Sequence, residues 1–352
     1  MKKLLRFLLV LVLIALVALG GLVGFLTATE FKPAPVETVA VTVSDPAAPP
    51  IPAVGELRVL SWNIGYAGLG AGSDFFMDGG KNSRSADNVT VNRYLNGIFN
   101  SILAEGAQMV MLQEVDSDSS RTYGIDETTA LRFGQTAYAL NYSCPFVPIP
   151  WPPMGKVNSG LLTMTDFAVD RAERIALPCP FTWPLSTANL KRCLLVNYLP
   201  IEGTDKQLVL VNLHLEAYDS GEGKIAQTNQ LRDFIQAEYE KGNYVIAGGD
   251  FNQTFPGSLT MYPILNFEFW TPGVLEDSIL PAGWHFAYDT ATPTCRLLNQ
   301  PYNPSDTINT QYYVIDGFIL SPNVEMQSVK TLDLGFENSD HNPVELNVIL
   351  VG

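Results

Sequence analysis

From residue 57 onward, short apolar runs alternate with longer stretches of helical periodicity. The apolar runs predict strands at 57–64, 109–115, 159–165, 192–200, 206–218, 244–252, 312–320 and 344–350. Helical spacing that ends at a glycine predicts helices at 91–106 and 225–242. Because no repeat and no second linker interrupts this pattern, we expect a single α/β domain, a sandwich of sheets flanked by helices.

The first 29 residues have a different pattern, with the basic stretch MKKLLR before an uncharged apolar run at 7–28. As a helix, that run is long enough to cross a hydrocarbon core of ~30 Å. A secretory signal usually has a shorter apolar region and a small-residue cleavage site, and no clean site is visible. We therefore favour a retained anchor over a cleaved signal for 1–29. Either alternative places the rest of the chain outside the cytoplasm, because the basic flank stays inside.

Residues 30–55 are rich in Pro, Ala and Val. This composition predicts an extended, semi-rigid spacer between the membrane and the folded domain. The catalytic domain is expected to begin at Glu56 and to occupy 56–352.

The overall charge narrows the choice of partners. The chain has 21 Lys and Arg against 36 Asp and Glu, a formal net charge of −15. A nucleic-acid binder normally carries a basic surface that neutralises phosphates, so tight binding of DNA or RNA is not expected. A small phosphorylated substrate remains compatible, since a bound divalent cation can reverse the local sign of the charge.

Four cysteines, Cys144, Cys179, Cys193 and Cys295, lack the CxxC spacing of a structural zinc site. Cys179 and Cys193 flank a predicted hairpin, so a disulfide is one alternative outside the cytoplasm. Buried free thiols are the other alternative, and the spacing alone leaves both open.

Polar side chains gather at or just past the ends of the predicted strands: Asn63, Glu114, His214, Asp250, Asn252 and Asp316. Residues at one set of strand ends converge on a common mouth, where sites form. Near the end of the chain, SDHNPV at 339–344 adds Asp340 and His341. Each residue alone is most simply a cap, a turn or a buried polar group, whereas their joint occurrence favours a site. His285 has no comparable context and is expected to be structural.

Six motifs carry a family resemblance: SWNI at 61–64, LQEV at 112–115, VNLHLEA at 211–217, GGDFN at 248–252, IDGFI at 315–319 and SDHNPV at 339–344. In this order they resemble the endonuclease/exonuclease/phosphatase superfamily of metal-dependent phosphoesterases, related to deoxyribonuclease I and neutral sphingomyelinase. Each motif is weak alone, but six in order on the expected elements are specific. The resemblance implies a deoxyribonuclease I-like four-layered α/β sandwich, with two packed mixed sheets flanked by helices.

The resemblance also implies a metal site. Glu114 would be the principal ligand of Mg²⁺, with Asn63 beside it and Asp340 as a second acid near the ion. Carboxylate and amide oxygens are the hard donors that Mg²⁺ prefers, and Mn²⁺ is a possible substitute.

Catalytic roles follow from the same resemblance. Asp250 would orient or deprotonate the attacking water, and Asn252 would hold a phosphoryl oxygen. His341 would pair with Asp316, because a carboxylate on one ring nitrogen sets the tautomer and raises basicity. His214 would contact the phosphoryl group and protonate the leaving oxygen, although which histidine is the acid and which the base stays open.

Two loops offer cations for the substrate phosphate. Lys81 and Arg84 lie in a Gly- and Ser-rich stretch, and Arg121 follows the metal-binding Glu114 motif. Phosphate clamps and solvated loop charges are both compatible with these positions. The apolar run at 144–155 is either a buried cover or a lip that leans on lipid.

Together these features predict a membrane-anchored, extracytoplasmic, Mg²⁺-dependent phosphoesterase that acts as a monomer on a small or lipid-borne phosphodiester or monoester. A secreted or surface-tethered nuclease is the alternative reaction. A binding protein on an inactive scaffold of the same kind is the alternative class, and the intact set of Glu114, Asp250, Asn252, Asp316 and His341 argues against it.

Overall fold

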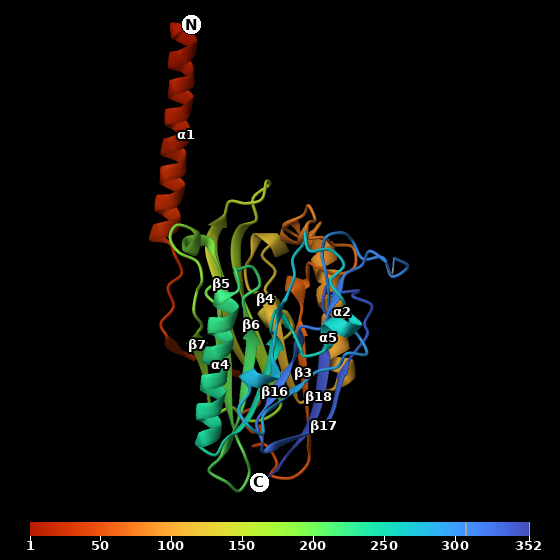
Figure 1. The fold of residues 1–352 in the computed structure, drawn as a ribbon. Coiled ribbons are helices and arrows are strands. Elements are labelled where there is room, and N and C mark those ends of the chain that lie inside the picture. The colour runs from red at the N-terminus through yellow and green to blue at the C-terminus, as the bar shows by residue number, and fades with distance from the viewer. Residues whose placement is uncertain (307, 352) are drawn as a thin grey trace.

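A computed structural model describes residues 1–306 and 308–351, and Figure 1 shows its fold. Two seven-stranded sheets pack face to face. The first has the order β1 (Val36–Val39), β7 (Arg171–Ala176), β8 (Cys193–Pro200), β9 (Gln207–His214), β10 (Tyr244–Asp250), β16 (Asp316–Leu320), β13 (His285–Ala287). The second has the order β17 (Val324–Thr331), β18 (Val344–Leu350), β3 (Glu56–Asn63), β4 (Met109–Asp116), β6 (Gly155–Thr165), β5 (Gln135–Val147), β2 (Val41–Val43).

The remaining elements are helices and two short ladders. The α-helices are α1 (Lys2–Ala28), α2 (Asn88–Glu105), α3 (Glu127–Ala130), α4 (Glu222–Glu240) and α5 (Ser258–Met261). Short 3₁₀ turns are η1 (Gly65–Ala67), η2 (Phe76–Asp78), η3 (Ser120–Thr122), η4 (Leu185–Ala188) and η5 (Asp277–Ile279). The ladders pair β11 (Gln253–Thr254) with β12 (Gly273–Val274) and β14 (Cys295–Arg296) with β15 (Tyr312–Tyr313).

Four layers result, because the central strands are apolar on both faces. Met111 of β4 packs between the sheets with Leu210 of β9. Its neighbour Leu112 points the other way, toward α2. On the far side, Leu231 of α4 covers the outer face of the first sheet, where Val211 lies. The four-layered α/β sandwich predicted from the motifs is therefore confirmed.

The two long helices begin earlier than their apolar spacing predicts. The Asp87 carboxylate caps α2 by accepting a hydrogen bond from the Thr90 amide at 2.7 Å. The helix ends at Gly106, whose φ of 60° is the left-handed conformation of a helix C-cap. Polar first turns carry no hydrophobic period, so the pattern of apolar residues locates a helix better than it locates its start.

A buried polar bridge joins the sheets directly behind the strand ends. The Gln113 side chain donates to Asn212 Oδ1 at 2.8 Å, and Asn212 Nδ2 donates to the carbonyls of Leu112 and Leu162, both at 3.1 Å. Buried amides must find partners, so this bridge sets how the two sheets lie against each other. Registers that pair Asn63 with Gln113 and Asp250 with both His214 and Asp316 then place the polar strand ends at one edge.

Residues 30–55, which we expected to form an extended spacer, contribute strands to both sheets instead. Strand β1 pairs with β7 and β2 pairs with β5, so this segment extends an edge of each sheet. Ile51 is fully buried and bridges Ile201. The folded body therefore begins before Glu56. The β-branched Val and Thr residues of VETVAVTV at 36–43 are the strand signal, and the unpaired edges of two sheets supply the partners.

Helix α1 is, within the described residues, the one helix long and apolar enough to cross a membrane. It projects from the end of the body opposite the C-terminus, on the side of the β5–β6 hairpin (Figure 1). Its last turns pack on the domain, where Leu26 is buried against Met154. Trp183 Nε1 donates to Thr27 Oγ1 at 3.0 Å, which ties the helix end to the loop that leads into η4.

All four cysteines are free thiols. The alternative of a Cys179–Cys193 disulfide is therefore not the one the structure adopts. Cys144, Cys193 and Cys295 are buried and Cys179 is half-buried, as the free-thiol alternative predicts.

Candidate active site

A cavity of about 530 Å³ opens where β3, β4, β9 and β10 end. Six of the residues predicted to be catalytic or to bind metal line it: Glu114, His214, Asp250, Asn252, Asp340 and His341. Two more are hydrogen-bonded to these lining residues. Asn63 donates to Glu114 and Asp250, and Asp316 bonds to His341. Residues from six separate motifs are thus brought into one site. His285 lies on the edge strand β13, outside the lining of this cavity.

The Asp250 carboxylate is the centre of the polar network. Its Oδ2 accepts a hydrogen bond from Asn63 Nδ2 at 3.0 Å and lies 3.4 Å from His214 Nε2 and 3.9 Å from His341 Nε2. Its Oδ1 accepts from the Asn252 amide at 2.8 Å. Burial, followed by the charge of Asp316, raises the pKa of Asp250 to about 7.

His341 is held on three sides. Its Nδ1 lies 2.8 Å from Asp316 Oδ2, and its backbone carbonyl accepts from Trp62 Nε1 at 2.8 Å. Its amide donates to Ser339 Oγ, which donates in turn to the Asn63 carbonyl. Burial alone would lower the pKa of His341, but Asp316 raises it well above the ordinary value. The ring therefore presents Nε2 to the cavity in one orientation.

His214 has the opposite electrostatic environment. Burial lowers its pKa well below the ordinary value, and the charges of Arg192 and His341 lower it further. Arg192 donates to the His214 carbonyl at 3.0 Å and forms an ion pair with Glu216 at 3.3 Å. The pKa values of the two histidines of the cavity are thus shifted in opposite directions, that of His214 downward and that of His341 upward.

Apart from the nearby histidines, the carboxylates at the mouth have no basic side chain as a partner in the described part of the chain. Among residues 1–306 and 308–351, no Lys or Arg forms an ion pair with Glu114, Asp250 or Asp340. Burial, together with the charge of nearby Glu114, raises the pKa of Asp340 to about 7, although His341 acts to lower it. Several buried acids without a counter-cation are destabilising unless a cation is bound, so this cluster fits a divalent ion.

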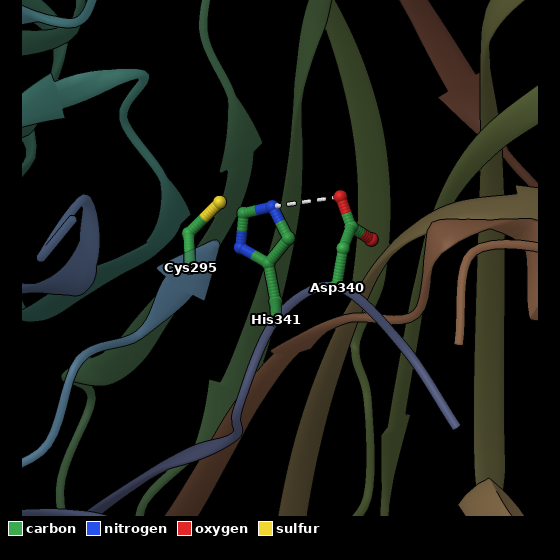
Figure 2. A group of neighbouring side chains, drawn as sticks. All are labelled: Cys295, Asp340 and His341. Carbon is green, nitrogen blue, oxygen red and sulfur yellow. Dashed lines mark ion pairs between the residues drawn. The ribbon is translucent and has the colours of Figure 1, made fainter. Parts of the chain in front are cut away.

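Figure 2 shows His341 between Asp340 and Cys295. The Asp340 carboxylate lies 3.9 Å from His341 Nε2, and the three side chains are close enough to share an ion. Burial raises the pKa of Cys295 to about 12, so the group is a thiol and a weak ligand. The remaining donors on this side are carboxylate oxygens, which suit a hard cation.

Strained backbone turns the key side chains into the cavity. Glu114 has φ 54° and Asn252 has φ 51°, in the left-handed region that non-glycine residues seldom adopt. Glu114 also lies where the register of β4 against β6 shifts. Bulges re-aim side chains at sheet edges, and such strain persists only where the surrounding structure imposes it.

The three cations expected near the phosphate occupy different places. Arg121 lines the cavity, but its guanidinium is engaged by two bonds to Asp116, both at 2.9 Å. Arg84 donates to the Pro153 carbonyl at 2.5 Å and so ties its loop to the β5–β6 hairpin. Lys81 is exposed, and neither it nor Arg84 is part of the cavity lining.

The structure adds residues that the motifs do not indicate. Tyr66 lines the cavity beneath the Arg121 guanidinium, 3.6 Å from its ring centroid, and its hydroxyl is buried without a partner. Asp78 also lines the cavity, where its carboxylate accepts from the Tyr218 hydroxyl at 2.9 Å. Tyr66 lies two residues after the SWNI motif, so its position in the sequence could have indicated it. Asp78 has no motif beside it, and only the folding of its loop brings it to the cavity.

No protein-family model matches the chain, and no curated protein is significantly similar to it in sequence. Solved structures are similar in fold. An endonuclease/exonuclease/phosphatase from Beutenbergia cavernae is 19% identical with a TM-score of 0.56, over 84% of this chain and 72% of that chain. An endonuclease/exonuclease/phosphatase family protein from Bacteroides thetaiotaomicron is 14% identical with a TM-score of 0.53, over 84% and 98%.

The catalytic domain of human Nocturnin, solved with a bound sulfate anion, is 17% identical with a TM-score of 0.50, over 89% of this chain and 97% of that chain. At identities this low, the similarity shows only that the folds are alike. For the fold, it confirms the resemblance that the six motifs predicted. Two seven-stranded sheets between helices, with the motif residues at one edge, give this chain the endonuclease/exonuclease/phosphatase fold.

Proposed function

We propose that the protein hydrolyses a phosphate ester with the help of a divalent cation, Mg²⁺ or Mn²⁺. The observation that carries the proposal is the convergence, in one cavity, of Asp250, the His341–Asp316 pair and the unbalanced acids Glu114 and Asp340. Phosphoryl transfer needs charge neutralisation, an aligned water and mobile protons, and these groups supply sites for all three.

The cation would be held by Glu114 and Asp340. Asn63 Nδ2 donates to Glu114 Oε1 at 3.2 Å and to Asp250, so it holds the two carboxylates in place. When bound, the cation would neutralise phosphoryl oxygens and help to set the attack geometry. Mg²⁺ is favoured because it takes one or two carboxylates and keeps several waters.

Around that ion the chain's own residues divide the work. Asp250 accepts hydrogen bonds at the centre of the network, which suits it to orient or deprotonate the attacking water. Nε2 of His214 and Nε2 of His341 both lie near Oδ2 of its carboxylate, at 3.4 and 3.9 Å, where they could reach phosphoryl oxygens. Asn252 lines the same cavity, with its Nδ2 bonded to the Leu215 carbonyl at 2.8 Å, and is assigned to a phosphoryl oxygen.

We assign the protein to a small or lipid-borne phosphoester, acting as a monomer outside the cytoplasm. The net charge of −15 disfavours a polyanion as substrate. Helix α1 supports a membrane anchor, and the basic residues Lys2, Lys3 and Arg6 at its start support an extracytoplasmic domain. We do not assign phosphate binding to Arg121, Arg84 or Lys81. Asp116 neutralises Arg121, and the other two residues lie outside the cavity lining.

The test uses the full chain in detergent with bis-p-nitrophenyl phosphate as substrate. We expect activity with Mg²⁺ or Mn²⁺, loss in EDTA and recovery when the metal is restored. Glu114→Gln should weaken Mn²⁺ binding measured by calorimetry as well as turnover. Glu56→Gln, on an exposed residue at the opposite end of the β-sandwich, is the matched control. Full activity in EDTA would overturn the proposal.

A further inference from the structure

The cavity that holds the acids continues into an apolar arm, and this arm has no part in the chemistry described above. Its walls are Val23 and Leu26 of α1, Val147, Ile149 and Met154 of the β5–β6 hairpin, and Leu185 of η4. The lining of one continuous cavity thus includes both His341 and the end of the helix that is apolar enough to span a membrane.

The end of α1 contacts β5 and η4, and Figure 1 shows that α1 projects from the body on the side of the β5–β6 hairpin. Apolar side chains there are open to solvent: Trp151 is 90% exposed and Trp183 is 63% exposed. At 1.5 Å per residue, α1 with its 27 residues is about 40 Å long, which exceeds a hydrocarbon core of ~30 Å. Its last turns therefore lie at the outer boundary of the bilayer, where Trp side chains are favoured.

We propose that the apolar arm binds the hydrocarbon chain of a lipid-borne phosphoester, so that α1 is a wall of the substrate site as well as an anchor. The inference rests on the proposed phosphoesterase function and names its substrate class. A hydrocarbon chain that moves from the bilayer into the arm lined by Val23 and Ile149 exchanges one apolar environment for another. Its phosphate would then lie toward Glu114 and Asp250, and the hydrocarbon chain would not be exposed to water.

The other substrate classes fit this arm less well. A nucleic acid would have to place a charged backbone against Leu26 and Met154, with no phosphate partner beside them. A small soluble ester would occupy the charged end and leave the apolar walls unfilled. Only an amphiphile uses both ends of the cavity.

Alkyl p-nitrophenyl phosphates test the idea, because the leaving group and the phosphodiester stay the same while the alkyl chain is lengthened. The full chain is reconstituted in phosphatidylcholine vesicles with Mg²⁺, and hydrolysis of the methyl, octyl and hexadecyl esters is followed. We expect kcat/KM to rise at least ~10-fold from methyl to octyl, since each buried methylene favours binding.

A matched pair of variants separates binding in the arm from partition of the ester into the vesicle. Val23→Ser changes a residue of the arm, whereas Val17→Ser makes the same change on the same helix at a residue 68% exposed. We expect Val23→Ser to lower the octyl-to-methyl ratio of kcat/KM at least ~3-fold and Val17→Ser to leave that ratio unchanged.

The outcomes distinguish the two proposals. Equal kcat/KM for all three chain lengths, or equal ratios in the two variants, overturns the lipid-chain inference while hydrolysis of the methyl ester still supports a phosphoesterase. No hydrolysis of any ester with Mg²⁺ or Mn²⁺ overturns the phosphoesterase proposal and the inference with it.

Discussion

The two ends of the cavity are built in different ways. The charged end consists of strand ends and the residues that follow them, and a continuous hydrogen-bond network holds Asn63, Asp250 and His341 in place. The apolar arm consists of a helix end, a hairpin tip and a 3₁₀ turn, with Trp151 beside it almost fully exposed. Rigid sheets position chemistry, whereas peripheral segments choose what reaches it.

The largest expected effect belongs to the charged end. Asp250→Asn should lower kcat at least ~10²-fold, because the carboxylate acts on the water in the transition state. The loss should be the same for short and long alkyl esters. Steady-state kinetics measure it, and circular dichroism checks that the fold is kept. Turnover like that of the wild type would remove Asp250 from the mechanism.

A smaller loss of kcat is expected for Asp316, which contacts His341 and not the reacting atoms. The hydrogen-bonding partner of Asp316 at the site is His341, 2.8 Å away, so Asp316→Asn should lower kcat ~10-fold while KM changes little. An exposed acid gives the control: Asp233→Asn, on the surface of α4, should change neither constant. A rise in KM at constant kcat would show that Asp316 serves binding instead of orienting the imidazole.

The same substitution, Trp to Phe, should change the free energy of unfolding by different amounts at the two ends of the cavity. Trp62 is 1% exposed and its Nε1 donates to the His341 carbonyl, so Trp62→Phe should destabilise the fold by about 1–3 kcal/mol. Trp151→Phe, on the exposed hairpin, should change stability by less than ~0.5 kcal/mol. Thermal or denaturant unfolding of the full chain in detergent measures both. Equal losses would mean that the hairpin is part of the core.

The smallest effect concerns the junction between α1 and the domain. Burial alone would raise the pKa of Glu30, but its hydrogen bond to Lys191, 3.1 Å away, and one to Ser186 lower it. A lowered folded-state pKa stabilises the fold above the ordinary value of 4.5, and that contribution disappears as the pH falls through the folded-state value.

Glu30→Gln should therefore lower the melting temperature slightly at pH 7. The difference from the wild type should shrink as the pH falls below 4.5 and vanish below the lowered folded-state pKa. Thermal melts of both proteins over a series of pH values from 7 downward measure it. A difference that persists unchanged at low pH would show that the Glu30 charge does not hold the junction.

At the edges of the two sheets the structure differs from what the sequence pattern predicted. Residues 36–43 are rich in Val and Thr, which favour strands, yet the surrounding prolines indicated a spacer. Only the unpaired edges of β7 and β5 turn this segment into strands β1 and β2, and those edges lie far away in the chain. Arg121 is similar, because Asp116 and the Tyr66 ring occupy a guanidinium that its position alone made a candidate phosphate ligand.

What could be read from the residues was the set of chemical groups and the end of the sheets on which they lie. Glu114 and Asp250 lie at the ends of apolar runs, and His341 lies just before one. Strand ends meet at one edge when such runs pair, so the fold class and the charged half of the cavity were predictable from local pattern and motif. The apolar arm was not. Val23 and Ile149 are ordinary apolar residues of a helix and a loop, and they form one wall with the acids only because α1 packs on the hairpin beside the strand ends. Burial and long-range packing, which carry no local signature, decided that half of the site.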